Sequence, residues 1–291
     1  MRTGTGMIEN DYFRDKVCLV TGANSGIGFA LSEGLLKRGA TVYLAGRAPK
    51  KIADAAEQLS VFKDRVHPIV VDVTHQEQVQ KAIEDAAGEA GRLDLLFNNA
   101  GILLMALFET ATLEEWRVMV DTNLWGVIYG VHAAVPIMLR QGSGHIVNVS
   151  SVGGIIPYPM QALYNTTKFA VTGLSESLRF EYAGKGLHVS TIFPGPVATP
   201  IYEKRLGKPD PLMKVPDDAI PAGPAATFIL DRVAERKPLI IVPEGFHDQL
   251  WRAYVSGDPG AEEMLLAHAH NRRLALERGD PAAAAAAPMH R

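Results

Sequence analysis

Short runs of apolar, β-branched residues alternate with helical segments from Val17 to Phe193. Continuous apolar runs of this kind are typical of strands buried on both faces of a parallel sheet. No internal repeat or domain linker interrupts the alternation, so we predict one α/β domain with a doubly wound parallel sheet. Ligands of such sheets bind outside the carboxyl ends of the strands, so the segments that follow each strand are candidates for a site.

A glycine-rich loop follows the first strand, Val17–Thr21, and leads into the helical run Phe29–Arg38. In this context glycines let the backbone approach a pyrophosphate, and the N–H groups at the helix start face its charge. A tight turn without a ligand is the simpler alternative, but the order of strand, loop and helix favours dinucleotide binding. The predicted contacts are Gly22, Asn24, Ser25, Gly26, Ile27 and Gly28.

The second strand, Thr41–Ala45, ends in Gly46 and Arg47. An NAD-binding chain carries a carboxylate ~20 residues past the glycine loop, where it accepts the ribose hydroxyls. No acid is near this position, and a guanidinium is a matched donor for the 2′-phosphate of NADP. We therefore predict NADP(H) in preference to NAD(H), the alternative being that Arg47 is a solvated loop cation.

The clearest chemical signal follows the strand His145–Val149. Ser151 stands just after this strand, and a helix beginning at Gln161 carries Tyr164 and Lys168. Residues i and i+4 share one helix face, so the phenol and the ammonium lie side by side. A hydroxyl, a phenol and an amine together can move a proton to or from a carbonyl oxygen. Alone, the tyrosine would be an ordinary helix residue and the lysine a solvated cation, so the combination predicts the site.

Two more segments, Asn98–Gly101 and Pro194–Thr199, follow predicted strands. An asparagine pair before a glycine suits a turn that contacts a cofactor, although by itself it is only turn chemistry. The helical pattern Leu113–Arg140 carries Asn123 in its interior, where asparagine is intrinsically unfavourable. With the glycine loop and the serine, these segments converge on one edge of the sheet.

In this order and context the motifs resemble the signatures of the short-chain dehydrogenase/reductase family. The signature TGxxxGIG corresponds to Thr21–Gly28, NNAG to Asn98–Gly101 and PG to Pro194-Gly195. The similarity covers roughly residues 15–243 and matches the soluble single-domain branch of the family. It implies a Rossmann-type sheet of seven strands, the last being Leu239–Val242, in one NADP-binding and catalytic domain.

The resemblance also implies roles for the reactive residues. The family's usual interval of 13 residues between its serine and tyrosine selects Ser151, rather than Ser150, as the partner of Tyr164. The tyrosine would be the general acid or base, and the serine would bind the same substrate oxygen. The fourth catalytic residue of the family corresponds to Asn123, which would anchor a water relay to Lys168.

Further cofactor contacts follow from the same resemblance. Asp72 and Val73, at the end of a strand predicted at Val66–Val73, would lie near the adenine, and Thr199 near the nicotinamide amide. The predicted contacts outside the glycine loop are Arg47, Asp72, Val73, Asn99, Ala100, Gly101, Tyr164, Lys168, Pro194, Gly195, Val197 and Thr199.

We therefore expect an enzyme that acts on CH–OH groups and transfers a hydride between NADP(H) and a ketone or secondary alcohol. Three segments are candidates for the substrate walls: Ile102–Met105, Ile155–Met160 and Pro200–Pro224. They are mostly apolar and uncharged, which favours a lipophilic substrate, unless these residues are simply core beneath the loops.

Two other functions stay open. One is a 3-oxoacyl-thioester reductase, whose acyl carrier or coenzyme A would meet the basic residues Lys204, Arg205, Lys208 and Lys214, although a solvated basic face is the simpler explanation. The other is a non-catalytic NADP-binding regulator, which the intact set of reactive residues disfavours.

Composition limits the partners and the compartment. The 29 basic and 32 acidic residues give a net charge of −3, so nothing favours nucleic acid or an anionic membrane. The one cysteine, Cys18, has no internal disulfide partner, which fits a reducing compartment. Neither a signal peptide nor an apolar run of ~18 residues is evident, so we expect a cytoplasmic protein. The resemblance implies a homodimer or homotetramer built on helices at Leu113–Arg140 and Gln161–Ala183.

The segments outside residues 15–243 differ in character from the domain. Phe246–Trp251 and Glu262–Arg273 are predicted as short helices that close over the pocket or cover an oligomer surface. His268 and His270 fall on different helix faces, so we predict no metal site. The expected divisions are a flexible leader at 1–14, a helical extension at 244–279 and a disordered alanine-rich tail at 280–291.

Overall fold

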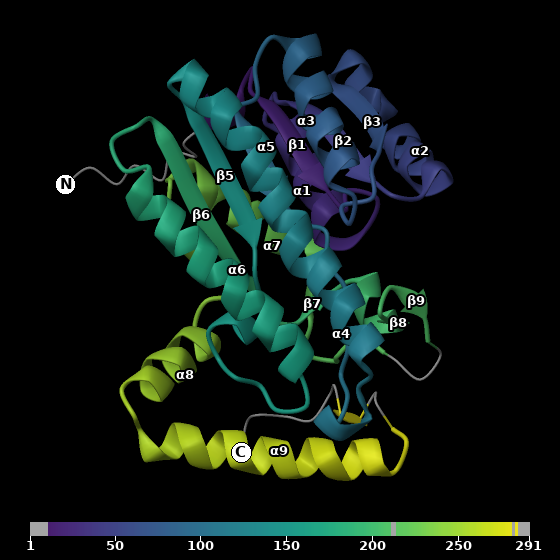
Figure 1. The fold of residues 1–291 in the computed structure, drawn as a ribbon, viewed down its shortest axis with the longest axis vertical. Coiled ribbons are helices and arrows are strands. Elements are labelled where there is room, and N and C mark those ends of the chain that lie inside the picture. Colours follow the sequence, from purple (N-terminus) through teal and green to yellow (C-terminus); the bar gives the residue numbers. More distant parts are fainter. Residues whose placement is uncertain (1–10, 211–213, 281–282, 285–291) are drawn as a thin grey trace, which may run out of the picture.

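The computed structural model describes residues 11–210, 214–280 and 283–284, and its centre is a seven-stranded sheet (Figure 1). The spatial order of the strands is β11-β6-β5-β4-β1-β2-β3, and every neighbouring pair is parallel. The strands are β1 (Val17–Thr21), β2 (Thr41–Gly46), β3 (Val66–Val70), β4 (Leu95–Asn98), β5 (Gly144–Val149), β6 (Leu187–Pro194) and β11 (Leu239–Val242). The predicted doubly wound sheet and its seventh strand are confirmed.

Helices cover both faces of this sheet because its strands bury apolar side chains alternately on either side. On β1, for example, Cys18 packs into one core and Leu19 into the other. The first core includes α1 (Gly26–Lys37), α2 (Pro49–Gln58) and α7 (Ala222–Ala234), and the second includes α3 (Gln76–Ala90), α5 (Gly126–Gln141) and α6 (Ala162–Glu181).

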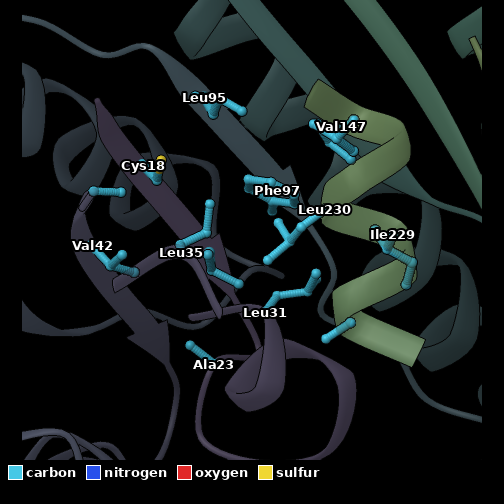
Figure 2. Packing of buried hydrophobic residues seen from close by; sticks show 14 of the residues in the cluster. Cys18, Ala23, Leu31, Leu35, Val42, Leu95, Phe97, Val147, Ile229 and Leu230 are labelled. Carbon is cyan, nitrogen blue, oxygen red and sulfur yellow. The ribbon is translucent and has the colours of Figure 1, made fainter. Parts of the chain in front are cut away.

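Figure 2 shows how α1 and α7 meet over the first core. Leu35 of α1 and Leu230 of α7 lie near Phe97 of β4, and all three side chains are fully buried. A methyl group on Gly34 would lie 2.6 Å from Leu230 Cδ1, so the glycine permits the two helices to approach closely. This packing holds the start of α1 against the sheet edge where the strands end.

The predicted long helix is interrupted by one turn of different geometry. It consists of α4 (Leu113–Val120), the π-helical turn η4 (Asp121–Trp125) and α5, and it begins at a capping box between Thr112 and Glu115. This run, Leu113–Gln141, is the one helix in the described residues that is long and apolar enough to cross a membrane by length and composition alone. Half of its most apolar window is buried inside the protein, as in a helix packed on a sheet.

The chain before β1 corrects one predicted boundary. Asp11–Phe13 forms a short 3-10 helix, the Phe13 side chain is fully buried, and Tyr12 Oη lies 2.9 Å from His145 Nδ1. The predicted flexible leader therefore does not extend to residue 14, because an aromatic side chain anchors the segment to the first core. Residues 1–10 and most of the predicted tail at 280–291 lie outside the described residues.

The remaining elements, apart from η2, which leads into the amino end of β3, gather at the carboxyl ends of the strands. The strand predicted at Val66–Val73 ends at Val70, which leaves Asp72 in the connection that follows. The extension contains α8 (Phe246–Val255) and α9 (Pro259–Glu277), both longer than predicted, and α9 crosses beneath the strand ends (Figure 1). The short elements are η2 (Ser60–Arg65), η3 (Phe108–Thr110), η5 (Val152–Gly154), β7 (Val197–Ala198), η6 (Pro200–Glu203), β8 (Lys204–Arg205), β9 (Lys208–Pro209) and β10 (Ile220–Pro221).

Replacing Phe13 by Ala tests whether the segment before β1 belongs to the core. The substitution should lower the free energy of unfolding by about 3–5 kcal/mol, because it leaves a cavity of aromatic size in a packed core. Chemical denaturation measures the change, with Phe108→Ala as the control, since Phe108 is 66% exposed. Equal stabilities of the two variants would contradict the anchoring role of Phe13.

Candidate active site

A cavity of about 270 Å³ runs along the carboxyl ends of the strands. Every cofactor contact predicted from the sequence, from Gly22 to Thr199, lies on its wall, and so do Ser151, Tyr164 and Lys168. Asn123 does not line it. The wall also includes Lys51 and Thr122, which were not selected from the sequence, and Tyr202, Lys204 and Gly207, which belong to the predicted substrate segment Pro200–Pro224.

The glycine loop approaches the neighbouring backbone so closely that side chains are excluded. Gly22 has a φ of +67°, and a Cβ on Gly28 would collide with the Gly22 carbonyl oxygen and lie 2.5 Å from Asn99 Nδ2. Asn99 fixes this arrangement, because its Nδ2 donates to Thr21 O at 2.8 Å and its backbone N donates to Thr21 Oγ1 at 2.9 Å. The start of α1 thus presents backbone N–H groups to the cavity, as pyrophosphate binding requires.

Ser151, Tyr164 and Lys168 meet where β5 ends. Ser151 is 8% exposed, its Oγ donates to Pro194 O at 3.4 Å and accepts a bond from Gly153 N at 3.1 Å. A Cβ on Gly153 would lie 3.5 Å from both Ser151 Oγ and Tyr164 Cδ1, so the two side chains flank this glycine. Lys168 is 3% exposed and donates from Nζ to Val149 O at 2.9 Å. The same Nζ lies 5.6 Å from the centroid of the Tyr164 ring. The three groups predicted to act on one oxygen therefore share one buried corner of the cavity.

Burial changes the proton affinity of both ionisable members of this cluster. It raises the pKa of Tyr164 above its ordinary value of 10.0, while the bond from Ser151 acts in the opposite direction. It also lowers the pKa of Lys168 to about 8, because an ammonium loses solvation in the interior. At neutral pH the tyrosine is consequently a neutral phenol that can donate a proton.

Asn123 stands behind the cavity wall and holds a loop. Its side chain is fully buried in the π-helical turn, Oδ1 accepts from Ile102 N at 2.8 Å, and Nδ2 donates to Ile102 O at 2.9 Å. A Cβ on Gly101 would lie 3.4 Å from Asn123 Oδ1 and 3.6 Å from Lys168 Nζ, so the two side chains flank this glycine. The water relay stays a prediction, and with the amide engaged it would have to start from the backbone carbonyl.

Positive charge collects at the opposite end of the cavity. Arg47, Lys51 and Lys204 all line it, and the pKa of Lys204 is lowered by burial first and then by the charges of Lys51 and Arg47. A Cβ on Gly207 would lie 3.0 Å from Arg47 Nη2, so the β8–β9 hairpin approaches the guanidinium, although Arg47 as a whole is exposed. Within the described ranges none of the three cations forms an ion pair, and this arrangement suits a bound anion.

The hairpin is itself fixed to the rest of the site. Leu206 N donates to Leu103 O at 3.0 Å, and Arg205 Nη2 pairs with Glu115 Oε1 at 2.8 Å. Lys204, which the sequence suggested was part of a solvated basic face, is instead half-buried in the cavity wall. The sequence shows the lysine but not the fold-back that brings it across from Arg47.

Two comparisons identify proteins similar to this chain in sequence. A family model described as short chain dehydrogenase matches residues 16–209. An uncharacterised oxidoreductase of Staphylococcus saprophyticus is 38% identical over 189 residues, which are 65% of this chain and 81% of that protein.

Solved structures resemble it over a larger share of the chain. A short chain dehydrogenase/reductase from Burkholderia phymatum in complex with NAD superposes with a TM-score of 0.73 at 27% identity, covering 92% of this chain and 96% of that one. A 3-ketoacyl-(acyl-carrier-protein) reductase from Brucella melitensis complexed with NADH gives a TM-score of 0.69 at 25% identity, covering 79% and 97%.

The bonds of Asn123 predict a measurable loss of stability. Asn123→Ala should lower the free energy of unfolding by about 2–4 kcal/mol, because it leaves the buried N–H and C=O of Ile102 without partners. Denaturant titration measures this loss, and Met119→Leu, which removes only the bond from Asn123 Nδ2 to Met119 Sδ and keeps the volume, should cost less than about 1.5 kcal/mol. A fully stable Asn123→Ala protein would refute the loop-holding role.

Proposed function

The chain belongs to the short-chain dehydrogenase family, and on this premise we propose that it is an NADP-dependent reductase of ketones to secondary alcohols. The family and the oxidoreductase relatives make it an NAD(P)-dependent dehydrogenase or reductase. The observation that carries the proposal is the meeting of Ser151, Tyr164 and Lys168 in one cavity with the glycine loop. A bound nicotinamide would supply the hydride to the substrate carbon or accept it.

The proton chemistry assigned to the protein follows from burial. Tyr164 gives its phenolic proton to the carbonyl oxygen as that oxygen becomes an alcohol, while Ser151 holds the same oxygen by a hydrogen bond. The raised pKa of Tyr164 keeps the proton in place at neutral pH, which favours reduction. For the reverse reaction the phenol must act as a base near neutral pH, and from its raised value the pKa would have to fall by more than about three units, or more than about 4 kcal/mol.

Lys168 is the group that eases this proton transfer. Its ammonium lies beside the tyrosine ring, and the positive charge stabilises the phenolate that forms when the proton leaves. The pKa of about 8 means that the lysine remains mostly protonated at neutral pH in spite of its burial. A chain of water molecules that begins at the backbone carbonyl of Asn123 would return a proton from solvent to Tyr164 through Lys168.

Preference for NADP is supported by the three cations at the far end of the cavity. Arg47 stands where an NAD-binding chain would carry a carboxylate, and Lys51 and Lys204 approach the same region. A 2′-phosphate is a dianion, and it would relieve the mutual repulsion of these cations, which the charge of Glu203 offsets only in part at Lys204. The relatives bound to NAD and NADH do not bear on this preference, because it depends on these three positions in this chain.

The proposed substrate is a ketone with an apolar carbon skeleton. Ile102 and Leu103 line the cavity, and Ile201 faces it from η6. Ile155 and Ile156, by contrast, are core residues beneath the loop, because they pack with α8 and α9 in a separate core cluster. An acyl-thioester substrate is the second candidate, since the Brucella melitensis structure is named as a 3-ketoacyl-(acyl-carrier-protein) reductase.

Assembly and compartment are also proposals. Exposed apolar residues on the α4–α5 run and on α6 support a homo-oligomer built on these helices; they are Val118, Trp125, Leu139, Phe169 and Phe180. A cytoplasmic location is supported by the single buried cysteine, which is unpaired in the described chain.

Replacing Tyr164 by Phe tests the reaction. Turnover of ketones should fall by about 10²–10⁴-fold, because only the transferred proton and its oxygen are removed. NADPH binding, measured by the change in cofactor fluorescence, should be retained. Tyr129→Phe is the control, because Tyr129 is a half-buried tyrosine of α5 that does not line the cavity. A Tyr164→Phe enzyme with full turnover would exclude the proposed mechanism.

Removing the cations tests the cofactor preference. Arg47→Ala and Lys204→Ala should each raise the KM for NADPH about 10–100-fold, since each charged bond to a phosphate contributes about 1.5–3 kcal/mol. The KM for NADH should change little, because NADH lacks that phosphate. Lys50→Ala is the control, as Lys50 pairs with Asp54 on the exposed side of α2. Equal effects on both cofactors would contradict the assignment.

A further inference from the structure

The inner face of α9 buries polar side chains where a packed helix ordinarily buries apolar ones. Its buried residues are Ala261, His268 and Arg272, which are 4%, 2% and 6% exposed. His268 and Arg272 are four residues apart and therefore share one face of the helix. Burying a cation and an imidazole is unfavourable unless partners compensate for the lost water.

The guanidinium of Arg272 is only partly compensated. Nη1 donates to Pro159 O at 2.9 Å, and the guanidinium carbon lies 5.9 Å from the centroid of the Tyr158 ring. Nε has no hydrogen-bond partner in the described part of the chain. Burial lowers the pKa of Arg272 to about 10, so the group keeps its positive charge at neutral pH. The groups that favour this charge are the phenols of Tyr158 and Tyr202, and no carboxylate is among them.

His268 adds a second unsatisfied group at the same place. Neither of its ring nitrogens has a partner among the described residues, and its ring stands edge-on to Tyr158 at 6.2 Å. Burial and the charge of Arg272 lower its pKa to about 3, so the imidazole is neutral and offers one N–H donor. No group of three metal-ligating side chains occurs in the described residues, so a metal does not explain this histidine.

This polar cluster lies against the active site. Tyr202 lines the cavity, and it is close enough to both Tyr164 and Arg272 for their charges to affect its pKa. Tyr158 Oη lies 2.9 Å from His247 Nδ1, and a Cβ on Gly195 of the cavity wall would lie 2.6 Å from His247 Nε2. Neither Arg272 nor His268 lines the cavity itself, and Tyr158 and His247 connect them with its wall at Gly195.

We propose that Arg272, with His268 beside it, binds a carboxylate of the substrate whose ketone is reduced at Tyr164. The inference rests on the proposed function and names the substrate class of the same site, a keto acid. A carboxylate accepts bonds only, so it would pair with the free Nε–H of Arg272 and with the N–H of His268. To reach Arg272 from Tyr164, the apolar chain of the substrate would pass Tyr202 on the cavity wall.

The test uses the full chain, NADPH and straight-chain keto carboxylates of increasing length, each compared with its methyl ester. The wild-type enzyme should reduce the best acid with a kcat/KM at least about tenfold above that of its ester. Arg272→Met removes the charge and retains much of the volume. It should lower kcat/KM for the acid about 100-fold, mainly through KM, and change the ester less than about threefold. Arg272→Lys should recover part of the loss.

Arg273→Met is the matched control, because Arg273 is the next residue, lies on the exposed side of α9 and pairs with Glu109 at 3.1 Å. It should leave the rates for acid and ester unchanged. If the wild-type enzyme does not prefer the acid and Arg272→Met slows both substrates alike, Arg272 only holds the loop at Pro159, and the proposal is wrong.

Binding separates this proposal from the proposed reaction. Calorimetry on NADPH-loaded Tyr164→Phe protein should detect the same keto carboxylates, and the added Arg272→Met substitution should abolish that binding. Binding that depends on Arg272, together with no reduction of any ketone by the wild-type protein, would refute the reaction and support the carboxylate site. Reduction of neutral ketones without carboxylate binding would refute the site and leave the reaction intact.

Discussion

Parallel pairing of all seven strands is the constraint on which the site depends. It brings the ends of β1, β2, β4, β5 and β6 to one edge, so groups far apart in sequence face one cavity. The register of β5 against β4 and β6 sets the level of Ser151, and the bond from Lys168 Nζ to Val149 O ties α6 to the same level. A shift of one strand by a residue would turn its side chains to the opposite face and separate these groups.

Positive charge is distributed along the cavity and behind it, and two of the four cations, Lys168 and Arg272, are buried. Arg47 and Lys204 approach one end, Lys168 is buried near the middle, and Arg272 lies behind the far end. Among the described residues no acid neutralises these groups by an ion pair. A dinucleotide phosphate, an oxygen that gains negative charge and a substrate carboxylate are the anions that would balance them.

The parts of the site that depend on local sequence were predictable, and those that depend on distant contacts were not. Tyr164 and Lys168 are set by helical spacing, and Gly22 by its position after a strand. Asn123 stood out as an unfavourable helix residue, but its bonds cross 21 positions to Ile102 and require a π-helical turn. Arg272 resembles a surface cation in sequence, because nothing near it in the chain tells which face of α9 packs inward.

The polar face of α9 has a consequence for how such an enzyme can be altered. The segment that the family model matches, residues 16–209, includes the glycine loop, the reactive trio and the hairpin, whereas α9 lies beyond it. The groups that bind the dinucleotide and move the proton thus lie on elements other than α9. A change on the inner face of this helix would alter what packs on the loop at Pro159 and leave Ser151, Tyr164 and Lys168 themselves in place.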